Sequence, residues 1–479
     1  MRVMLNNFYK KPNLINFTKI IFIFLFLLNL YNIVFSLKIF LLLNLVLLVH
    51  YISIFYFLKN ENNKYFAILP LIITFFFITY TLSFLIGNKD FFLLSFDEMV
   101  LQKSIFILVL GLSSLLFGYI IVDKFFKRRE KKIFYFNFSK QQQILILVVC
   151  SIVTFLVYYN NTCFSFVNFS FLKQIKEPLI LFNFGLFLTL ILMRNNKSLF
   201  LYILFIGLLL VLFIFEISTG ATVFIFYLLS FLIAIYFYLK KKLPLISIAL
   251  IILLAIFFHS IKYQLRELVW NKNERTNCVE KIFIMKSVAF NFDYDDKSKT
   301  DHKSYYDLNT TRLFHSINSL NIISKLTPDI VPFFQGNSYK IIYSKFIPRD
   351  LWNNKPEEIQ GNFWGHRYFI VNPEDNTTSW NFPVLNEFYA NFGIIGVVFG
   401  MFFLGFFTKL LLLKLWTKNS SNIEMLTSSV IIFNLFFLEN NLSQIIGKII
   451  NEFIFFNIIF LFLYLLVKFI SRYFKSFSL

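Results

Sequence analysis

The chain has 479 residues, of which 58% are hydrophobic and 70 are phenylalanine, and its mean hydropathy is +0.68. Repeated apolar runs of about twenty residues can each cross a hydrocarbon core roughly 30 Å thick, so the composition excludes an ordinary soluble protein. The net charge of +20 would suggest nucleic acid in a soluble chain, but here the basic residues lie in short clusters beside the apolar runs. That placement indicates membrane topology and gives no support to a nucleic-acid partner.

The apolar runs predict an all-α polytopic integral membrane protein with about 12 transmembrane helices. No small-residue cleavage site follows the first run, which therefore predicts a retained signal-anchor helix. The predicted spans are 20–36, 39–58, 65–86, 104–122, 143–159, 178–193, 198–216, 219–239, 243–260, 392–413, 423–438 and 450–470.

The basic clusters predict which side of the membrane each connection occupies. With Arg2, Lys10 and Lys11 in the cytoplasm, nearly every other basic cluster is also cytoplasmic, as the positive-inside rule requires. Both termini are then cytoplasmic. These clusters are Lys127 to Arg129, Arg194 with Lys197, Lys240 to Lys242, Lys414 with Lys418, and Arg472 with Lys475.

The same topology places one long polar segment, about 261 to 383, on the outer face, and a connection this long is usually functional. The chain is thus predicted to comprise a membrane domain (1–260), a large outer loop (261–385) and a second membrane part (386–479). Within the loop, Lys262 to Glu280 and the region near Tyr305 to Ile323 are expected to be short amphipathic helices lying on the bilayer.

Cysteine patterns and cofactor motifs add little. Cys163 and Cys278 fall in predicted outer connections, where a disulfide and two separate thiols are equally compatible with the sequence. The chain has no CxxC, HExxH, P-loop or dinucleotide fingerprint, so zinc, ATP hydrolysis and redox cofactors gain no support. No cofactor and no metal site are expected.

The outer loop carries a group of cations and aromatics shortly before the tenth span. Arg349 follows a proline and precedes Trp352 by three residues, and Lys355 precedes another proline. A guanidinium can grip phosphate through two hydrogen bonds, an ammonium adds a point charge, and an indole can stack on a sugar ring. The alternative is an ordinary interfacial belt that anchors the protein at the headgroups.

Glu387 lies just before the tenth span and is expected at the outer mouth of the membrane domain. A partly dehydrated carboxylate there could act as a general base or pair with a loop arginine. The alternative is a carboxylate at a helix amino terminus, where the helix dipole favours it. Gly396 and Gly400, which follow in GxxxG spacing, predict close helix packing.

Other candidates are weaker. Arg266 and Arg312 are further loop cations, and Glu216 lies in a tight turn predicted on the outer side, where it either takes part in a site or marks the water boundary. The predicted catalytic residues are Arg349, Lys355, Glu387, Arg266 and Arg312. The predicted substrate-contacting residues are Trp352, Tyr389, Arg367, His366, Tyr339 and Glu216.

These features resemble the O-antigen and capsule repeat-unit polymerases of the Wzy type. The resemblance rests on many spans with one large outer loop late in the chain, and on a string of motifs covering about sixty residues. The motifs are Gly336-Asn-Ser-Tyr339, Ile347-Pro-Arg349-Asp-Leu-Trp352, Lys355-Pro356, Pro383, Glu387-Phe-Tyr389, Asn391-Phe-Gly393 and Gly396. Two positions depart from the family pattern: Asn386 stands where a small residue is usual, and the turn at Ser218 to Gly220 lacks an arginine.

The resemblance implies a metal-independent GT-C-like glycosyltransferase of the bacterial inner membrane, related in architecture to the O-antigen ligases. Such an enzyme moves a growing glycan from undecaprenyl pyrophosphate to a lipid-linked repeat on the periplasmic face. It implies that Arg349 and Lys355 hold pyrophosphate, and that Glu387 orders the site or deprotonates the acceptor hydroxyl. The implied partners are the lipid-linked oligosaccharide, membrane lipids, a chain-length regulator and a flippase.

Two other functions remain open. A ligase that joins the glycan to another acceptor would differ only in that acceptor. A flippase or transporter of lipid-linked sugars would also need cations, but it should carry ionisable sites deep within its spans. The predicted spans are nearly free of ionisable residues, which favours the polymerase.

Overall fold

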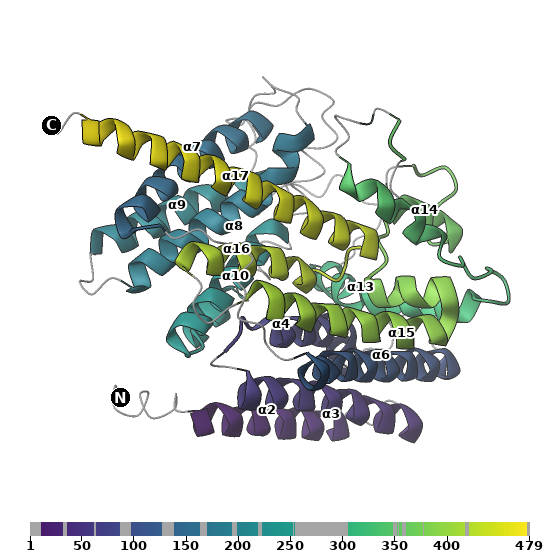
Figure 1. Ribbon diagram of the computed structural model, residues 1–479. Coiled ribbons are helices and arrows are strands. Elements are labelled where there is room, and N and C mark those ends of the chain that lie inside the picture. The colour runs from purple at the N-terminus through teal and green to yellow at the C-terminus, as the bar shows by residue number, and fades with distance from the viewer. Residues whose placement is uncertain are drawn as a thin grey trace, which may run out of the picture. The chain divides into compact units, whose positions relative to one another are not determined.

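The computed structural model describes most of the chain, and every regular element in that part is a helix (Figure 1). The all-α prediction is therefore confirmed for these residues. They are 11–31, 36–61, 64–86, 97–126, 138–162, 170–193, 199–218, 223–251, 253, 305–347, 352, 354–356, 361–376, 378–416 and 421–476.

Seven helices in the described part are long and apolar enough to cross a membrane, which suggests a multi-pass membrane protein. They are Leu37–Asn60, Ile68–Leu85, Glu98–Phe125, Lys176–Met193, Val223–Lys240, Val384–Leu415 and Leu442–Leu465. Shorter apolar helices occupy Thr18–Leu27, Gln142–Leu156, Leu199–Ile214 and Asn422–Phe436. Each of these long and shorter helices overlaps one of the predicted spans. The range predicted as the ninth span, 243–260, is described only to residue 251 and at residue 253.

The chain divides into two compact units, each made of separate stretches of sequence. The first unit comprises Met1–Ile133, Thr310–Lys418 and Ile431–Asn451, and the second comprises Phe134–Asn309, Asn419–Val430 and Glu452–Leu479. The later half of the predicted outer loop thus belongs to the same unit as the first helices of the chain.

The first unit holds the long helices of the amino-terminal part, the later half of the predicted outer loop and the helix that follows it. Its elements are α2 (Lys11–Tyr31), α3 (Leu37–Asn60), α4 (Ile68–Phe76), the π-helix η1 (Phe77–Thr81), α5 (Leu82–Ile86), α6 (Glu98–Phe125), most of α13 (Tyr305–Leu326), η3 (Asn337–Phe346), α14 (Gly361–Arg367), α15 (Val384–Leu415), η5 (Asn434–Phe436) and the start of α17 (Leu442–Ser476).

Helices α6 and α15 form the closest helix pair of this unit and run side by side (Figure 1). Small residues allow the approach: a Cβ atom at Gly118 would lie 2.1 Å from the carbonyl oxygen of Phe402, and one at Gly405 would lie 2.0 Å from that of Leu115. Contacts this short mean that the two backbones touch, as small residues permit in membrane helices.

Helix α15 is two helical segments joined by a sharp break. Phe392 and Gly393 have non-helical dihedrals, and Gly393 adopts φ +63° and ψ −147°. A Cβ atom at Gly400 would meet the ring of Phe388 at 2.5 Å, so the first segment folds back against the second. The close packing predicted at Gly396 and Gly400 is present, but it joins two parts of one helix.

Replacing Gly393 by alanine is expected to destabilise the protein by about 1–3 kcal/mol, because this backbone region is open almost only to glycine. The new Cβ atom would also lie 2.9 Å from the ring of Phe333. Thermal unfolding of the purified protein in detergent measures the effect. Gly207→Ala is the matched control, since no atom lies within 4 Å of its added Cβ. Equal unfolding temperatures for the two variants would contradict the strain assigned to Gly393.

The later part of the predicted outer loop and the start of α15 form a helical cap, residues 314–347 and 361–391. A helix was predicted near Tyr305 to Ile323, and α13 confirms it. However, α13 does not lie on a surface with one wet face, because nearly every side chain from Phe314 to Ser324 is buried. Its polar side chains are instead bonded inside the unit, as when Trp380 Nε1 donates to Ser319 Oγ at 2.7 Å.

The second unit is a separate helical bundle. It contains α7 (Lys140–Thr162), α8 (Ser170–Met193), α9 (Leu199–Ser218), α10 (Val223–Lys240), most of α16 (Asn422–Phe433) and the remainder of α17. Phenylalanine contacts join α8 to α17, where the ring of Phe182 packs on those of Phe456 and Phe460 with centroids 5.6 and 5.5 Å apart.

Candidate functional site

Two motif segments that lie about fifty residues apart in the sequence meet in the cap. Asn391 joins them, since its Oδ1 accepts a hydrogen bond from Gly336 N at 2.9 Å. Its Nδ2 donates to Ser338 Oγ and to the carbonyl oxygen of Glu387, both at 2.9 Å. The side chain of Asn391 is wholly buried, so these bonds hold both segments in one arrangement.

The turn at Gln335 and Gly336 brings the first of these segments to α15. Both residues have positive φ, +50° and +79°, which reverses the chain within two residues. Phe334 N and Gln335 N then donate to the carbonyl oxygens of Ala390 and Asn391, at 3.0 and 3.1 Å. These carbonyl groups lie immediately before the break at Gly393, where helical bonding stops and leaves them available.

Glu387 lies at the centre of this cluster and is wholly buried. Its Oε2 accepts a hydrogen bond at 2.7 Å from the backbone N–H of Leu442, the first residue of α17. The carboxylate thus sits at the amino terminus of a second helix as well as in the first turn of its own, and both dipoles favour a negative charge there. This is the helix-terminal arrangement that the sequence offered as the alternative to a general base.

The charge of Glu387 affects the pKa of the neighbouring Tyr339. Burial raises the pKa of Tyr339 and the Glu387 carboxylate raises it further, while the nearby polar side chains of Asn391 and Ser338 oppose the rise. The ring of Tyr339 stacks on Phe392, with centroids 6.4 Å apart. The phenol therefore stays protonated at neutral pH and can serve as a hydrogen-bond donor.

Asn386 explains one departure from the resembled family. Its Oδ1 accepts a hydrogen bond from Tyr80 OH at 2.7 Å, and its Nδ2 donates to the carbonyl oxygen of Ser316 at 3.0 Å. Tyr80 belongs to the π-helix η1, a distortion that often positions a side chain at a functional site. The amide at 386 therefore joins α13 and η1 to α15, which a small residue could not do.

Lys103 is a further cation near these motifs, and its place in the sequence does not distinguish it from a boundary residue. It lies on α6, its Nζ donates to the carbonyl oxygen of Ser324 at 2.6 Å, and it lies 5.7 Å from the ring centroid of Tyr389. A lysine directly before an apolar run is read as a topology signal, and its proximity to α13 and α15 depends on the fold. Lys103 and Tyr389 thus lie beside each other next to α13, and Lys103 remains exposed.

The predicted catalytic segment is described only in part. Lys355 Nζ donates to the carbonyl oxygen of Ile347 at 2.7 Å, which draws together the two sides of the stretch that contains Arg349. Trp352 packs on Tyr343 with ring centroids 6.2 Å apart. Arg349 itself lies outside the described residues, so its predicted position beside Trp352 stays a prediction.

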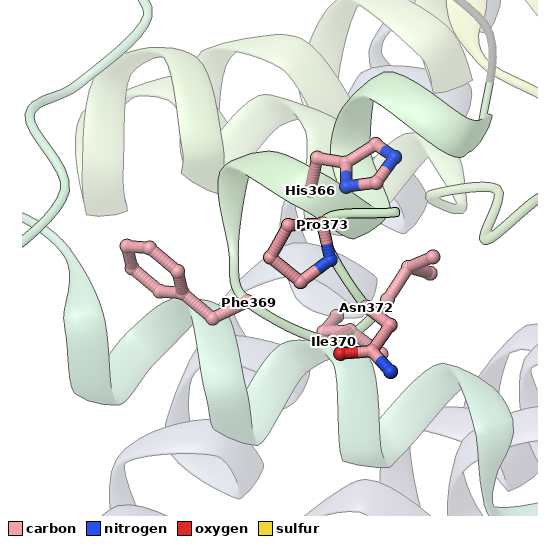
Figure 2. A pocket seen from close by; sticks show the side chains of 6 residues that line it. His366, Phe369, Ile370, Asn372 and Pro373 are labelled. Carbon is pink, nitrogen blue, oxygen red and sulfur yellow. The ribbon is translucent and has the colours of Figure 1, made fainter. Parts of the chain in front are cut away.

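Arg367 and His366, at the end of α14, have different surroundings. Arg367 donates from Nη2 to the carbonyl oxygen of Pro332 at 2.7 Å and lies over the ring of Phe334, 4.7 Å from its centroid. Arg367 therefore connects α14 to the turn at Gln335 and Gly336, which is hydrogen-bonded to Asn391. His366 lines an open hollow of about 710 Å³ (Figure 2).

Three predicted positions cannot be assigned to this cluster. Arg266 lies outside the described residues, and of Arg312 only the helical backbone is described. Glu216 belongs to the second unit, where it is buried and forms an ion pair with Lys176 at 2.9 Å. Cys163 and Cys278 also lie outside the described residues.

Within the part of the chain that is described, no three His, Cys, Asp or Glu side chains could jointly hold a metal ion.

A second polar cluster surrounds Lys409, near the other end of α15. Lys409 is wholly buried, and its Nζ contacts Glu61 and lies 3.1 Å from Asp123. Tyr119 OH donates to Glu61 Oε2 at 2.7 Å, and Tyr56 OH donates to Asp123. Burial raises the pKa of Glu61, an effect that Lys409 and Tyr119 only partly oppose. Lys409 is an exception to the prediction that the spans are nearly free of ionisable residues.

Comparison with protein-family models, with curated proteins and with solved structures finds no match to this chain.

Proposed function

We propose that this protein is a glycosyltransferase that polymerises undecaprenyl-pyrophosphate-linked oligosaccharide repeat units into O-antigen, capsule or exopolysaccharide on the outer face of a bacterial inner membrane. The observation that carries the proposal is the cluster around Asn391. There the motif segments 336–339 and 387–393, which resemble those of repeat-unit polymerases, are bonded to each other. A set of short motifs that met by chance would have no reason to share one buried hydrogen-bond network.

The proposed reaction needs few groups from the protein. An acceptor hydroxyl oxygen forms a bond to the anomeric carbon of the donor sugar, the bond from that carbon to pyrophosphate breaks, and the hydroxyl proton is released. Pyrophosphate takes the electron pair and gains charge as it leaves. Cations that face this charge stabilise the transition state without a metal ion.

The residues have distinct roles in this proposal. Arg349 and Lys355 hold the pyrophosphate, and Lys103 adds a further cation from α6. Tyr339 and Tyr389 contact the sugars. Glu387 is a positioning residue, because its buried carboxylate fixes α15 against α17.

The wider setting follows the sequence predictions. The proposed fold is a GT-C-like bundle of about twelve spans, with both termini in the cytoplasm and the cap at the periplasmic face. The proposed substrates are a lipid-linked growing chain and a lipid-linked repeat, and a flippase and a chain-length regulator would act beside it.

Deleting the gene from the source organism and complementing it tests the proposal. Wild type is expected to restore a ladder of surface glycan on a gel, whereas Arg349→Ala and Lys355→Ala, present at normal abundance, restore at most a single repeat. Lys340→Ala is the matched control, because Lys340 is an exposed cation of the same cap outside the motifs. It should restore the full ladder.

The ladder also separates the other functions. Normal ladders from both alanine variants would mean that these cations form only an interfacial belt. If the deletion removes even the single repeat while lipid-linked glycan accumulates, the protein is a ligase or a flippase.

A further inference from the structure

The hollow beside α14 is built on a rigid turn. The carbonyl oxygen of Gly365 accepts hydrogen bonds from Ile370 N at 2.8 Å and Val371 N at 3.2 Å. Beneath the turn, Trp364 stacks on Phe382 with ring centroids 4.9 Å apart. The lining residues of the hollow thus lie on and around a hydrogen-bonded turn that follows a buried aromatic residue. They are His366, Phe369, Ile370, Val371, Asn372 and Pro373.

Phe369 is unusual in two ways at once. Its φ is +58°, a left-handed conformation that a bulky residue rarely adopts, and its side chain is 74% exposed. Both features cost free energy, and strained residues of this kind are concentrated at ligand-binding positions. Figure 2 shows the ring of Phe369 standing apart from His366 and Pro373.

The chemistry of the lining matches a carbohydrate. An open aromatic ring offers its negative face to the C–H groups of a sugar ring. The amide of Asn372 both donates and accepts hydrogen bonds, as does a neutral imidazole at His366, and sugar hydroxyl groups need both. Apart from His366, none of the lining residues is ionisable, which favours a neutral ligand over a phosphate.

We propose that this hollow is a carbohydrate subsite, in which Phe369 stacks on a sugar of the glycan away from the reacting residue. That the bound glycan is the growing polymer rests on the proposed function. The subsite is joined to the Asn391 cluster, because Arg367 bonds Pro332 and packs on Phe334, whose N–H donates to Ala390. A volume of about 710 Å³ falls within the usual range for small-molecule sites.

Phe369→Gly tests the subsite with little risk of misfolding, since glycine favours positive φ. The probe is a soluble oligosaccharide of two repeat units released from the surface glycan of the source organism, added to the purified full chain in lipid nanodiscs. The variant is expected to bind this probe about tenfold more weakly than wild type, with an unfolding temperature no lower. Ile330→Ala is the matched control, because it also removes an exposed apolar side chain of the cap, 66% exposed, and it should bind normally.

A second variant separates a glycan from a lipid as the ligand of Phe369. In Phe369→Trp, the fluorescence of the new tryptophan is obtained by subtracting the wild-type signal. This fluorescence should change when the oligosaccharide binds, and brominated lipids should not quench it. Quenching by these lipids, or unchanged affinity in Phe369→Gly, would overturn the subsite.

The outcome is independent of the polymerase proposal. If the deletion strain keeps its ladder while Phe369→Gly still loses oligosaccharide binding, the polymerase proposal fails and the subsite stands. If the ladder depends on the protein but binding is equal in wild type and Phe369→Gly, the subsite fails and the polymerase stands.

Discussion

Replacing Lys409 by methionine is expected to lower the free energy of unfolding by about 3–5 kcal/mol. The change leaves Glu61, which is only 2% exposed, without the ammonium group that it contacts. The hydrogen bond from Tyr119 would remain, but one phenol does not offset the cost of keeping a buried carboxylate charged. Asp123 is less affected, because its side chain is 38% exposed and water can compensate it.

Thermal unfolding and the yield of folded protein in detergent measure this effect. Lys414→Met is the matched control, since Lys414 is an exposed lysine in the last turn of the same helix. Combining Lys409→Met with Glu61→Gln should recover much of the loss, because the second change removes the unpaired charge. If Lys409→Met unfolds at the same temperature as Lys414→Met, the cluster does not stabilise the protein.

If the protein is the proposed polymerase, Glu387→Gln is expected to slow polymerisation by about a hundredfold while the protein stays folded and abundant. A glutamine oxygen can still accept the hydrogen bond from Leu442 N, so the contact to α17 is kept. What is lost is the negative charge at the start of both helices, next to Asn391, whose side chain bonds the carbonyl oxygen of Glu387 to Ser338. Small displacements at a site of group transfer can cost two orders of magnitude in rate.

The pH dependence of the residual rate distinguishes positioning from catalysis. If Glu387 positions the site, the Glu387→Gln variant keeps the pH profile of the wild type at a lower rate. If Glu387 is the general base, the profile loses its acidic limb. A rate equal to that of the wild type would remove Glu387 from the site altogether.

The helices were largely predictable, because an apolar run long enough to cross a bilayer must satisfy its backbone hydrogen bonds internally, and a helix does so. The ends were not, since polar residues continue a helix beyond its apolar part: α6 begins at Glu98, before the predicted start at residue 104. In the same way α8 begins at Ser170 and contains Pro178, which the prediction took as its start.

The break in α15 at Gly393 could not be predicted from the pattern of apolar residues. The predicted span began at residue 392, which is where the helical geometry stops. Nothing in the spacing of the apolar residues indicates that the preceding segment is also a helix. Nor does it indicate that this segment folds back and places Phe388 on Gly400. That arrangement depends on a single glycine with a positive φ, and glycine is as common in packing contacts as in breaks.

The site was predictable only through its motifs. Glu387, Tyr339 and Tyr389 were selected from the sequence and lie in the cap, whereas Lys103 was not selected, because its contact to Ser324 crosses more than two hundred residues. The cluster of Lys409, Glu61 and Asp123 was missed for the same reason. Each charge lies at or near a span end, where it resembles an ordinary boundary residue.

Reconstitution with purified components tests the polymerase proposal most directly. The full chain in lipid nanodiscs is mixed with one purified undecaprenyl-pyrophosphate-linked repeat unit, and the lipid-linked products and the released undecaprenyl pyrophosphate are measured by mass spectrometry. The proposal predicts lipid-linked glycans of two, three and more repeats, with one undecaprenyl pyrophosphate released for each bond formed. Substrate that stays as a single repeat in the presence of folded, abundant protein would contradict it.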